Sequence, residues 1–202
     1  MFIQVIQGRA VDPDGISRAA DRWLAELQPG ADGWLGSTAG VTEDGRFISV
    51  VRFESEEQAR RNSDRPEQGA WWSETSQHLA DPVFHDSRRV HVYQGGGSDE
   101  AGFVQVIQGH TEDMERLAVL GRAQEQLLAG QAPHVLGMTV AEHADRPGDF
   151  TQTVYFTSEE EARRFEREHP AESDAAFAEI FSLLSDLRYY DLRSPRLESP
   201  GG

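Results

Sequence analysis

The chain of 202 residues carries 35 acidic against 19 basic side chains, a net charge of -16, and every basic side chain is arginine. The charge disfavours nucleic acid and membranes as partners, the lack of Lys excludes Schiff-base chemistry, and the lack of Cys excludes thiolate nucleophiles and zinc-thiolate sites. Asp12, Asp14 and Asp21 interrupt the N-terminal segment and no apolar run reaches the about 20 residues of a membrane span, so we expect a cytoplasmic protein.

The sequence repeats itself. "FIQVIQG" at 2–8 returns as "FVQVIQG" at 103–109, identical at six of seven places, and the segment 34–61 aligns with 134–164. Between the copies lies the Gly-rich, polar stretch "QGGGSDEAG", which is typical of a flexible linker. We therefore predict a first repeat at 1–94, a linker at 95–102, a second repeat at 103–194 and a flexible tail at 195–202.

In the first repeat, the strand at 2–8 is followed by a helix that begins with Asp12 as N-cap and ends at Pro29-Gly30. Two strands joined by the turn "TEDG" follow. A capping box of Ser55 and Gln58 then opens a second helix, which Pro66 interrupts and which resumes to about Leu79. We expect "SRRVHVY" to form the strand that closes this sheet.

The second repeat has the same order of elements. A strand at 103–109 precedes a helix from Thr111 to about Ala129, and a strand pair is joined by "ADRPG". Ser158 and Glu161 form the second capping box, Pro170 interrupts the helix, and "LRYYDLR" is the last strand. The order β-α-β-β-α-β in each half predicts two ferredoxin-like α+β repeats fused in one chain.

The opening strand indicates how such repeats pair. Pleating places Phe2, Gln4 and Ile6 on one face and Ile3, Val5 and Gln7 on the other, so both faces are mostly apolar. Helices of the same repeat can cover only one of these faces. We therefore expect the two sheets to face each other in a barrel built within one chain.

The repeated β-α-β-β-α-β half, the passage "F-x-S-E-E-x-A-R" and a Trp-bearing second helix resemble the dimeric α+β barrel superfamily, closest to antibiotic-biosynthesis-monooxygenase-like domains. The resemblance covers nearly the whole chain. It implies a barrel with pockets between sheet and helices, here as an internal pseudo-dimer that is either monomeric or paired again as a homodimer. Relatives of this kind include cofactor-independent oxygenases of aromatic polyketides, haem-degrading enzymes and proteins without known activity.

Comparison of the second helices points to a site in the first repeat. Thr75 and Ser76 stand where the second repeat has Ile180 and Phe181, and two hydroxyls in place of two large apolar groups leave room for a polar-edged aromatic ligand. The second repeat is expected to be packed scaffold. Ligand contacts are predicted for Trp71, Trp72 and His78 on the same helix, where the alternatives are a core position for Trp72 and a solvated face for His78.

The resemblance also implies a catalytic set. Asn62, Trp71 and Arg52 match the kinds of residue that stabilise a substrate carbanion in the polyketide oxygenases, although Asn62 is also a candidate helix C-cap and Arg52 a candidate partner for a nearby acid. Gln4 and Gln105 on the repeated strand either bond each other or line a shared cavity.

Cofactors are not expected. In haem-degrading relatives the first strand carries an Asn, whereas this chain has Gln4 there, and His78 follows the Trp pair at a shorter spacing, so haem is the less favoured ligand. The spacing of the other histidines predicts no metal site. The favoured function is a cofactor-independent monooxygenase acting on an aromatic substrate. The alternatives are a protein that binds an aromatic or haem-like ligand without turnover, or a structural barrel.

Overall fold

A computed structural model describes residues 1–128, 130, 132–170 and 175–201, except the side chains at 127, 128 and 176. The chain divides into two compact units: the first unit is Met1–Arg88 with Arg196–Gly202, and the second unit is Arg89–Pro195. Each unit holds a five-stranded antiparallel sheet, in the order β10-β2-β3-β1-β4 in the first and β5-β7-β8-β6-β9 in the second.

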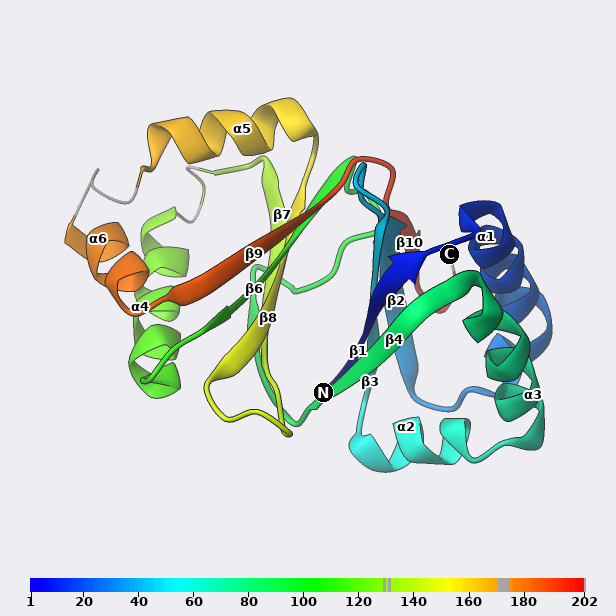
Figure 1. Cartoon of the computed structure of the whole chain (residues 1–202). Helices are drawn as coiled ribbons and strands as arrows, with labels where there is room; N and C mark the ends of the chain where they lie inside the picture. Colours follow the sequence, from blue (N-terminus) through cyan, green and yellow to red (C-terminus); the bar gives the residue numbers. More distant parts are fainter. Residues whose placement is uncertain (129, 131, 171–174, 202) are drawn as a thin grey trace. The chain divides into compact units, whose positions relative to one another are not determined.

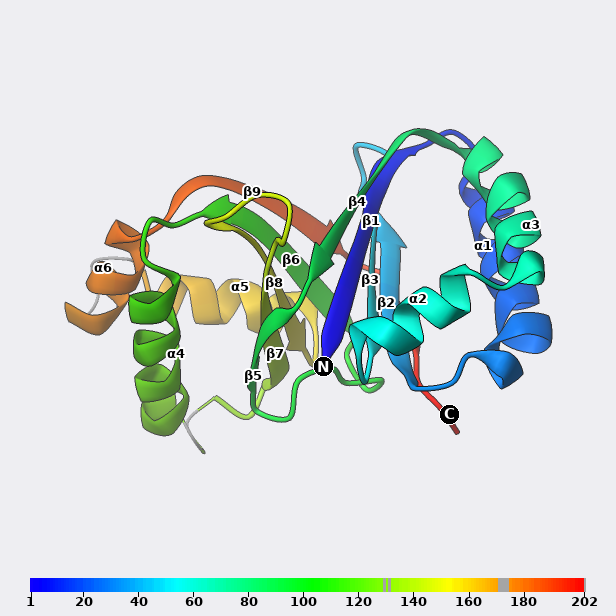
Figure 2. The ribbon, with the colours of Figure 1, turned by 90° about the horizontal axis from the view of Figure 1, so that it is seen from below.

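The elements of the first unit follow the predicted β-α-β-β-α-β order. They are β1 (Phe2–Ala10), α1 (Pro13–Arg22), a π-helical turn (Trp23–Leu27), a 3-10 turn (Gln28–Gly30), β2 (Trp34–Val41), β3 (Arg46–Phe53), α2 (Glu56–Ser63), α3 (Pro66–Thr75), a second 3-10 turn (Ser76–His78), β4 (Leu79–Ser87) and the added β10 (Arg196–Glu198). The helices α1, α2 and α3 cover one face of the sheet (Figures 1 and 2).

The second unit repeats this arrangement. Its elements are β5 (Arg89–Tyr93), β6 (Phe103–His110), α4 (Met114–Leu128), β7 (Val135–Glu142), β8 (Asp149–Phe156), α5 (Glu159–Glu168), α6 (Ala175–Ser182) and β9 (Ser185–Leu192). Ala129, where the sequence predicts the end of the first helix, lies outside the described residues. Helices α4, α5 and α6 lie on one face of the sheet (Figure 1). The prediction of two ferredoxin-like α+β repeats in one chain is confirmed, and the facing of their sheets stays a prediction.

One strand assignment is wrong. The sequence predicts that "SRRVHVY" closes the first sheet, but the closing strand is β4, and the residues Arg89–Tyr93 form β5 at the edge of the second sheet, paired with β7. The C-terminal Arg196–Glu198, expected in a flexible tail, pairs with β2 of the first sheet. Gly202 of that tail lies outside the described residues. Each sheet therefore takes an edge strand from the end of the other repeat.

The strand β4 is difficult to predict from the sequence because it contains Pro82 and is irregular. The pairing of β1 with β4 shifts register between Gln7 and Arg9, and Asp81 adopts a left-handed φ of 50° beside this bulge. Proline is tolerated at such a bulge and on an edge strand, where its missing N–H leaves no ladder bond unmade. In the second unit, Asp186 has the equivalent φ of 53°.

The predicted serine and aspartate N-caps form. The Ser55 hydroxyl accepts the Gln58 N–H at 3.2 Å, and the Ser158 hydroxyl accepts the Glu161 N–H at 3.2 Å. Asp12 caps α1 by accepting the Gly15 N–H at 2.9 Å. Within the described part of the chain, no helix is long and apolar enough to cross a membrane.

Removal of one cap should have a measurable cost. In Ser158→Ala the Glu161 N–H loses its acceptor, and we expect the free energy of unfolding to fall by about 1 kcal/mol. Urea denaturation followed by circular dichroism measures the change. Ser73→Ala, an exposed position in α3, is the control and should stay within about 0.5 kcal/mol of the unmodified protein. Equal losses in the two variants would contradict the capping role.

Candidate functional site

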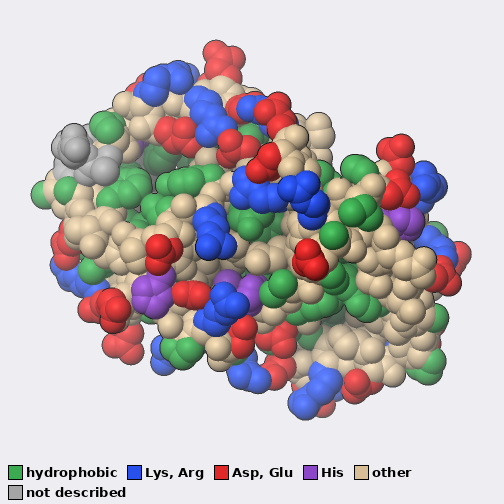
Figure 3. All heavy atoms as spheres, viewed as in Figure 1, with side chains coloured by type: hydrophobic (Ala, Val, Ile, Leu, Met, Phe, Trp, Pro, Cys, Tyr) green, Lys and Arg blue, Asp and Glu red, His purple; other side chains and the backbone are tan. Residues whose placement is uncertain are grey.

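The second unit contains a cavity of about 660 Å³ between its sheet and the helices α4, α5 and α6. The hollow is visible between α5 and β9, where hydrophobic side chains gather (Figure 3). The expectation that the second repeat is packed scaffold is therefore wrong. A volume of this size falls within the roughly 300–1,000 Å³ of small-molecule sites.

The floor of the cavity follows from the strand register. Because side chains alternate between the faces of a sheet, residues paired across all five strands line one face in rows. Two rows line the cavity: Tyr93, Met138, Val154, Gln105 and Asp191 in the first, and His91, Val140, Gln152, Ile107 and Tyr189 in the second. Polar groups thus stand on the edge strands β5 and β9 and on β6, whereas the inner strands β7 and β8 carry Met138, Val140 and Val154 together with one amide, that of Gln152.

The walls are mostly apolar. Their residues on the three helices include Met114, Leu117, Ala118, Phe165, Phe177 and Ile180. Phe177 and Ile180 belong to α6, whose apolar residues made this repeat look closely packed in the sequence. They border the cavity instead of filling it.

The space exists because the second repeat lacks tryptophan. In the first unit Trp23 and Trp34 are buried in one core cluster, against which Trp71 packs, and the rings of Trp23 and Trp34 meet edge to face at 5.2 Å. When the repeats are aligned on Asp12 and Asp113, and on the strand pairs that end in Phe53 and Phe156, Gln124 stands for Trp23 and Val135 for Trp34.

The third substitution, Ala176 for Trp71, follows from the alignment of the second helices, and all four tryptophans of the chain lie in the first repeat. Gln124 in place of Trp23 and Val135 in place of Trp34 leave unfilled volume between sheet and helices. The absence of tryptophan from the second repeat is therefore the sequence feature that indicates the cavity.

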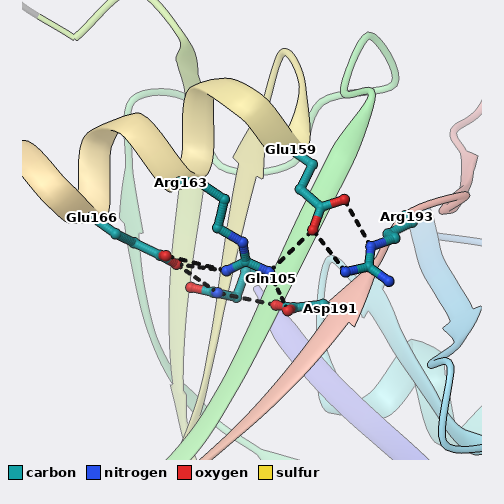
Figure 4. A network of polar contacts seen from close by, with 6 residues as sticks. All are labelled: Gln105, Glu159, Arg163, Glu166, Asp191 and Arg193. Atoms are coloured by element: carbon teal, nitrogen blue, oxygen red, sulfur yellow. Dashed lines mark hydrogen bonds and ion pairs between the residues drawn. The ribbon is translucent and has the colours of Figure 1, made fainter.

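A polar network closes the cavity at the β6 and β9 side (Figure 4). Gln105 on β6 donates through its amide nitrogen to Glu166 at 2.9 Å and to Asp191 at 3.1 Å. Arg163 on α5 pairs with Asp191, with Glu166 at 3.0 Å and with Glu159 at 3.3 Å. Burial works against the charge of Arg163, but the ion pairs with Asp191 and Glu166 outweigh it and raise its pKa.

Part of this network is structural, because the first unit has its counterpart. Gln4 donates to Asp86 at 2.9 Å as Gln105 donates to Asp191, so each glutamine has a carboxylate partner within its own unit. Likewise, Arg88 holds Glu56 by two hydrogen bonds of 2.5 and 2.6 Å.

The matching pair in the second unit is Arg193 and Glu159, with hydrogen bonds of 2.7 and 3.0 Å. The Arg193 guanidinium lowers the pKa of Glu159. Arg163 and Glu166 have no such counterpart pair, since Arg60 and Ser63 stand at the equivalent places in the first repeat. They are the additions that face the cavity.

The opposite side of the cavity is formed by β5 and α4. Burial, reinforced by the charge of Arg122, lowers the pKa of His91 below its usual 6.5, and burial raises the pKa of Tyr93. Gly121 on α4 leaves room for the Tyr93 ring. A Cβ at this position would lie 2.7 Å from the phenolic oxygen, which is too close for a side chain to fit. A neutral imidazole and a protonated phenol thus stand two residues apart on one face of a strand.

The residues predicted as catalytic lie in the first unit and do not converge. Arg52 is buried and donates a hydrogen bond to Thr38 at 3.0 Å. Its neighbour Val51 packs against the core that the helices cover, so Arg52 lies on the opposite face of β3. Asn62 accepts a hydrogen bond from Arg65 at 3.0 Å near the end of α2. Trp71 donates its indole N–H to the Ala19 carbonyl at 2.8 Å. The sheet separates Arg52 from Trp71.

The predicted ligand contacts on the same helix also have local partners. Thr75 donates to the Trp71 carbonyl at 2.8 Å and Ser76 to the Ser73 carbonyl at 3.3 Å. Trp72 lies edge to face with Phe84 at 5.0 Å, and His78 lies 3.1 Å from Asp12. Of the predicted set, Gln105 is the residue that lines the second-unit cavity.

No protein-family model matches this chain, and no curated protein matches it in sequence. Solved structures do match in fold. A proposed monooxygenase of Lactobacillus acidophilus is 12% identical at a TM-score of 0.76, covering 98% of this chain and 96% of its own. A proposed monooxygenase of Fusobacterium nucleatum is 9% identical at a TM-score of 0.72, covering 100% and 95%. An anthrone oxidase-like protein is 12% identical at a TM-score of 0.71, covering 100% and 94%.

These matches span both repeats of the chain. The expected fold is therefore confirmed, since it is shared over the whole chain with two proposed monooxygenases and an anthrone oxidase-like protein. Identities of this size show the fold alone.

The ion-pair network should make stability depend on pH. In Arg163→Met, the three carboxylates that Arg163 pairs lose a cation, so we expect the free energy of unfolding to fall by about 1 kcal/mol at pH 7. Arg193 and, to a smaller extent, Arg163 lower the pKa of Glu159. The share that Arg163 contributes is present above the unfolded pKa of Glu159 and is lost as the pH falls through the folded value, so the deficit should shrink below about pH 4. Urea titrations at pH 7 and at about pH 3 measure this.

The matched control is Arg164→Met at the next position on α5, which removes pairs with Glu161 and Glu168 on the exposed side of the helix. A change within about 0.5 kcal/mol is expected there. A deficit in Arg163→Met that stays constant from pH 7 to about pH 3 would argue against the charge explanation.

Two histidines should titrate on opposite sides of the usual value of 6.5. The pKa of His91 is lowered by burial and Arg122, and the pKa of His110 is raised by its hydrogen bond to Asp149. An NMR titration of the ring protons should place His91 below 6.5 and His110 above it. In Asp149→Asn the value for His110 should fall and that for His91 should not move; a reversed order would refute both assignments.

Proposed function

We propose that the second-unit cavity binds an aromatic compound and that the chain is a cofactor-independent monooxygenase acting on it. The observation that carries the proposal is the cavity itself: about 660 Å³, lined mostly by apolar side chains, with ionisable groups at its two edges. The fold is shared with two proposed monooxygenases and an anthrone oxidase-like protein, which makes this class of reaction the first to test.

The reaction class needs no cofactor if the substrate can give up a proton from an activated ring carbon. A CH2 group between two aryl rings meets this condition when a carbonyl joins the same two rings on the other side, across the central ring, as in an anthrone. Deprotonation gives a carbanion that reacts with O2; one oxygen atom forms the new carbonyl, and the second leaves as water with the two hydrogens of the CH2 group. The substrate supplies all the electrons, so no reductant is required.

His91 is the proposed general base. Its lowered pKa keeps the imidazole neutral near pH 7, so the lone pair can accept a proton from the substrate, while Glu142 acts against Arg122 to favour the resulting imidazolium. Tyr93 stays protonated because burial raises its pKa, and its hydroxyl can donate to the enolate oxygen of the substrate. The apolar walls keep water from reprotonating the carbanion.

Oxygen consumption tests the proposal. With 1,8-dihydroxyanthrone in air, we expect O2 uptake and anthraquinone formation above the uncatalysed rate. Ala118→Phe places a ring in the cavity wall and should abolish the excess, whereas Val119→Phe, the next residue on α4 and 58% exposed, should retain it. His91→Gln should lower kcat by about 10² to 10⁴ if His91 is the base.

The alternative is binding of an aromatic or haem-like ligand without turnover. A spectral shift of the bound anthrone or of haem that Ala118→Phe abolishes, with no O2 uptake above background, would support binding and refute catalysis. Uptake that is equal in the unmodified protein and Ala118→Phe would remove the cavity from the reaction altogether.

A further inference from the structure

Two amide side chains at the β5 and α4 edge of the cavity each have a buried atom without a hydrogen-bond partner. Gln124 is 7% exposed, lines the cavity, and its amide nitrogen has no hydrogen-bond partner. Gln94, directly after β5, also lines the cavity, and its amide oxygen is buried without a partner. Among the described residues that line this cavity, these are the two side chains with such atoms.

An unpaired buried amide is costly. Leaving a buried polar group without a hydrogen bond costs roughly 1 to 3 kcal/mol, which is why such groups in folded proteins usually have partners. Packing alone does not call for an amide at position 124, because the equivalent place in the first unit holds Trp23, whose indole N–H donates to Gln68 at 2.7 Å. An amide in a cavity can recover the cost when a ligand supplies the missing partner.

The charges around the cavity restrict what that partner can be. Glu125, Glu166 and Asp191 line it together with one guanidinium, that of Arg163. Glu125 is held beside Gln94 by accepting its backbone N–H at 2.5 Å. A ligand carboxylate or phosphate near Gln124 would meet a carboxylate without a nearby counter-ion among the lining residues, and like charges in a partly desolvated site repel. The group that pairs with the Gln124 amide nitrogen is therefore not an anion, and it is not a cation, because a cationic group cannot accept the hydrogen bond that this nitrogen lacks. It is neutral.

The two polar edges of the cavity are well separated. In the sheet order β5-β7-β8-β6-β9, three strand spacings lie between β5 and β6, or roughly 14 Å at the usual spacing. Between them, the inner strands β7 and β8 present Met138, Val140 and Val154 to the cavity, with the amide of Gln152 held 2.7 Å from the Met138 sulfur. An elongated, fused-ring molecule fits this arrangement better than a compact one.

We propose that Gln124 and Gln94 form a polar subsite for a neutral hydroxyl or carbonyl oxygen at one end of a fused-ring aromatic ligand. Gln124 donates to the ligand oxygen, and a ligand hydroxyl donates in turn to Gln94. This inference rests on the proposed function, because it specifies the ligand of the same cavity. It assigns selectivity for uncharged, terminally oxygenated rings to two residues outside the Arg163 network.

Three rigid probes of nearly equal shape test the subsite: 2-hydroxyfluorene, fluorene and fluorene-2-carboxylate. Binding is measured without O2, from the fluorescence of the probe. For the unmodified protein we expect 2-hydroxyfluorene to bind about tenfold more tightly than fluorene, as one net hydrogen bond allows, and the carboxylate to bind most weakly. A carboxylate that binds as tightly as the hydroxyl compound would overturn the neutral-ligand assignment.

Gln124→Leu should weaken binding of 2-hydroxyfluorene about tenfold and leave fluorene unchanged or tighter. Gln124→Met, which keeps the unbranched shape, is the second variant in case Leu disturbs the fold, and thermal unfolding is checked for both. The control is Gln126→Leu, an exposed glutamine on the same helix, which should keep the preference for the hydroxyl compound.

The outcomes separate the subsite from the proposed function. If both uncharged probes bind and Ala118→Phe prevents it, but the Gln124 variants keep the tenfold preference or lose affinity for both probes equally, the subsite is refuted and the cavity function stands. If neither uncharged probe binds the unmodified protein, or if Ala118→Phe changes nothing, the proposed function is refuted and the subsite with it.

Discussion

The space between a sheet and its covering helices must be filled, and this requirement separates the two halves of the molecule. In the first unit Trp23, Trp34 and Trp71 meet it, with ring contacts and indole hydrogen bonds that leave each large side chain packed. The second unit has the same frame of strands and helices, but Gln124, Val135 and Ala176 stand at these positions. Dense packing is the normal state of a protein interior, so a frame that keeps its geometry while losing three indoles retains a cavity.

The frame itself is specified by the repeated strand motif. In "FIQVIQG" and "FVQVIQG" the first glutamine, Gln4 or Gln105, bonds an aspartate on the neighbouring edge strand. The closing glycine, Gly8 or Gly109, lies against the bulge of that edge strand, where a Cβ would come within 2.9 Å of the Ala80 carbonyl oxygen in the first unit. These shared contacts explain why the motif occurs in both repeats. Conversely, residues that differ between the repeats, such as Glu166 and Gln124, are the ones that face the cavity.

Much of the fold follows from local sequence signals, because caps, turns and alternation act over a few residues. Ser55, Ser158 and Asp12 begin helices as the sequence predicts. The strand β4 is missed because Pro82 and the bulge beside Asp81 disrupt the alternation that marks a strand. The site is harder to predict, since polar helix residues such as Thr75 and Ser76 find partners in their own helix. Their hydroxyls indicate no pocket, whereas the missing tryptophans of the second repeat do, once the repeats are aligned. Pairings between distant segments, such as Gln105 with Glu166, need the fold itself.

The exchange of edge strands has a consequence for how the chain can change. The Gly-rich stretch 95–102 joins β5 to β6, both of which belong to the second sheet, so a break there would leave β5, and with it His91 and Tyr93, on the fragment that carries the first repeat. The C-terminal β10 would leave with the opposite fragment. Duplication produced two similar halves, but each sheet takes one edge strand from the end of the other repeat, so the two halves depend on each other. Neither half can be lost, duplicated again or recombined alone without opening the edge of a sheet in what remains.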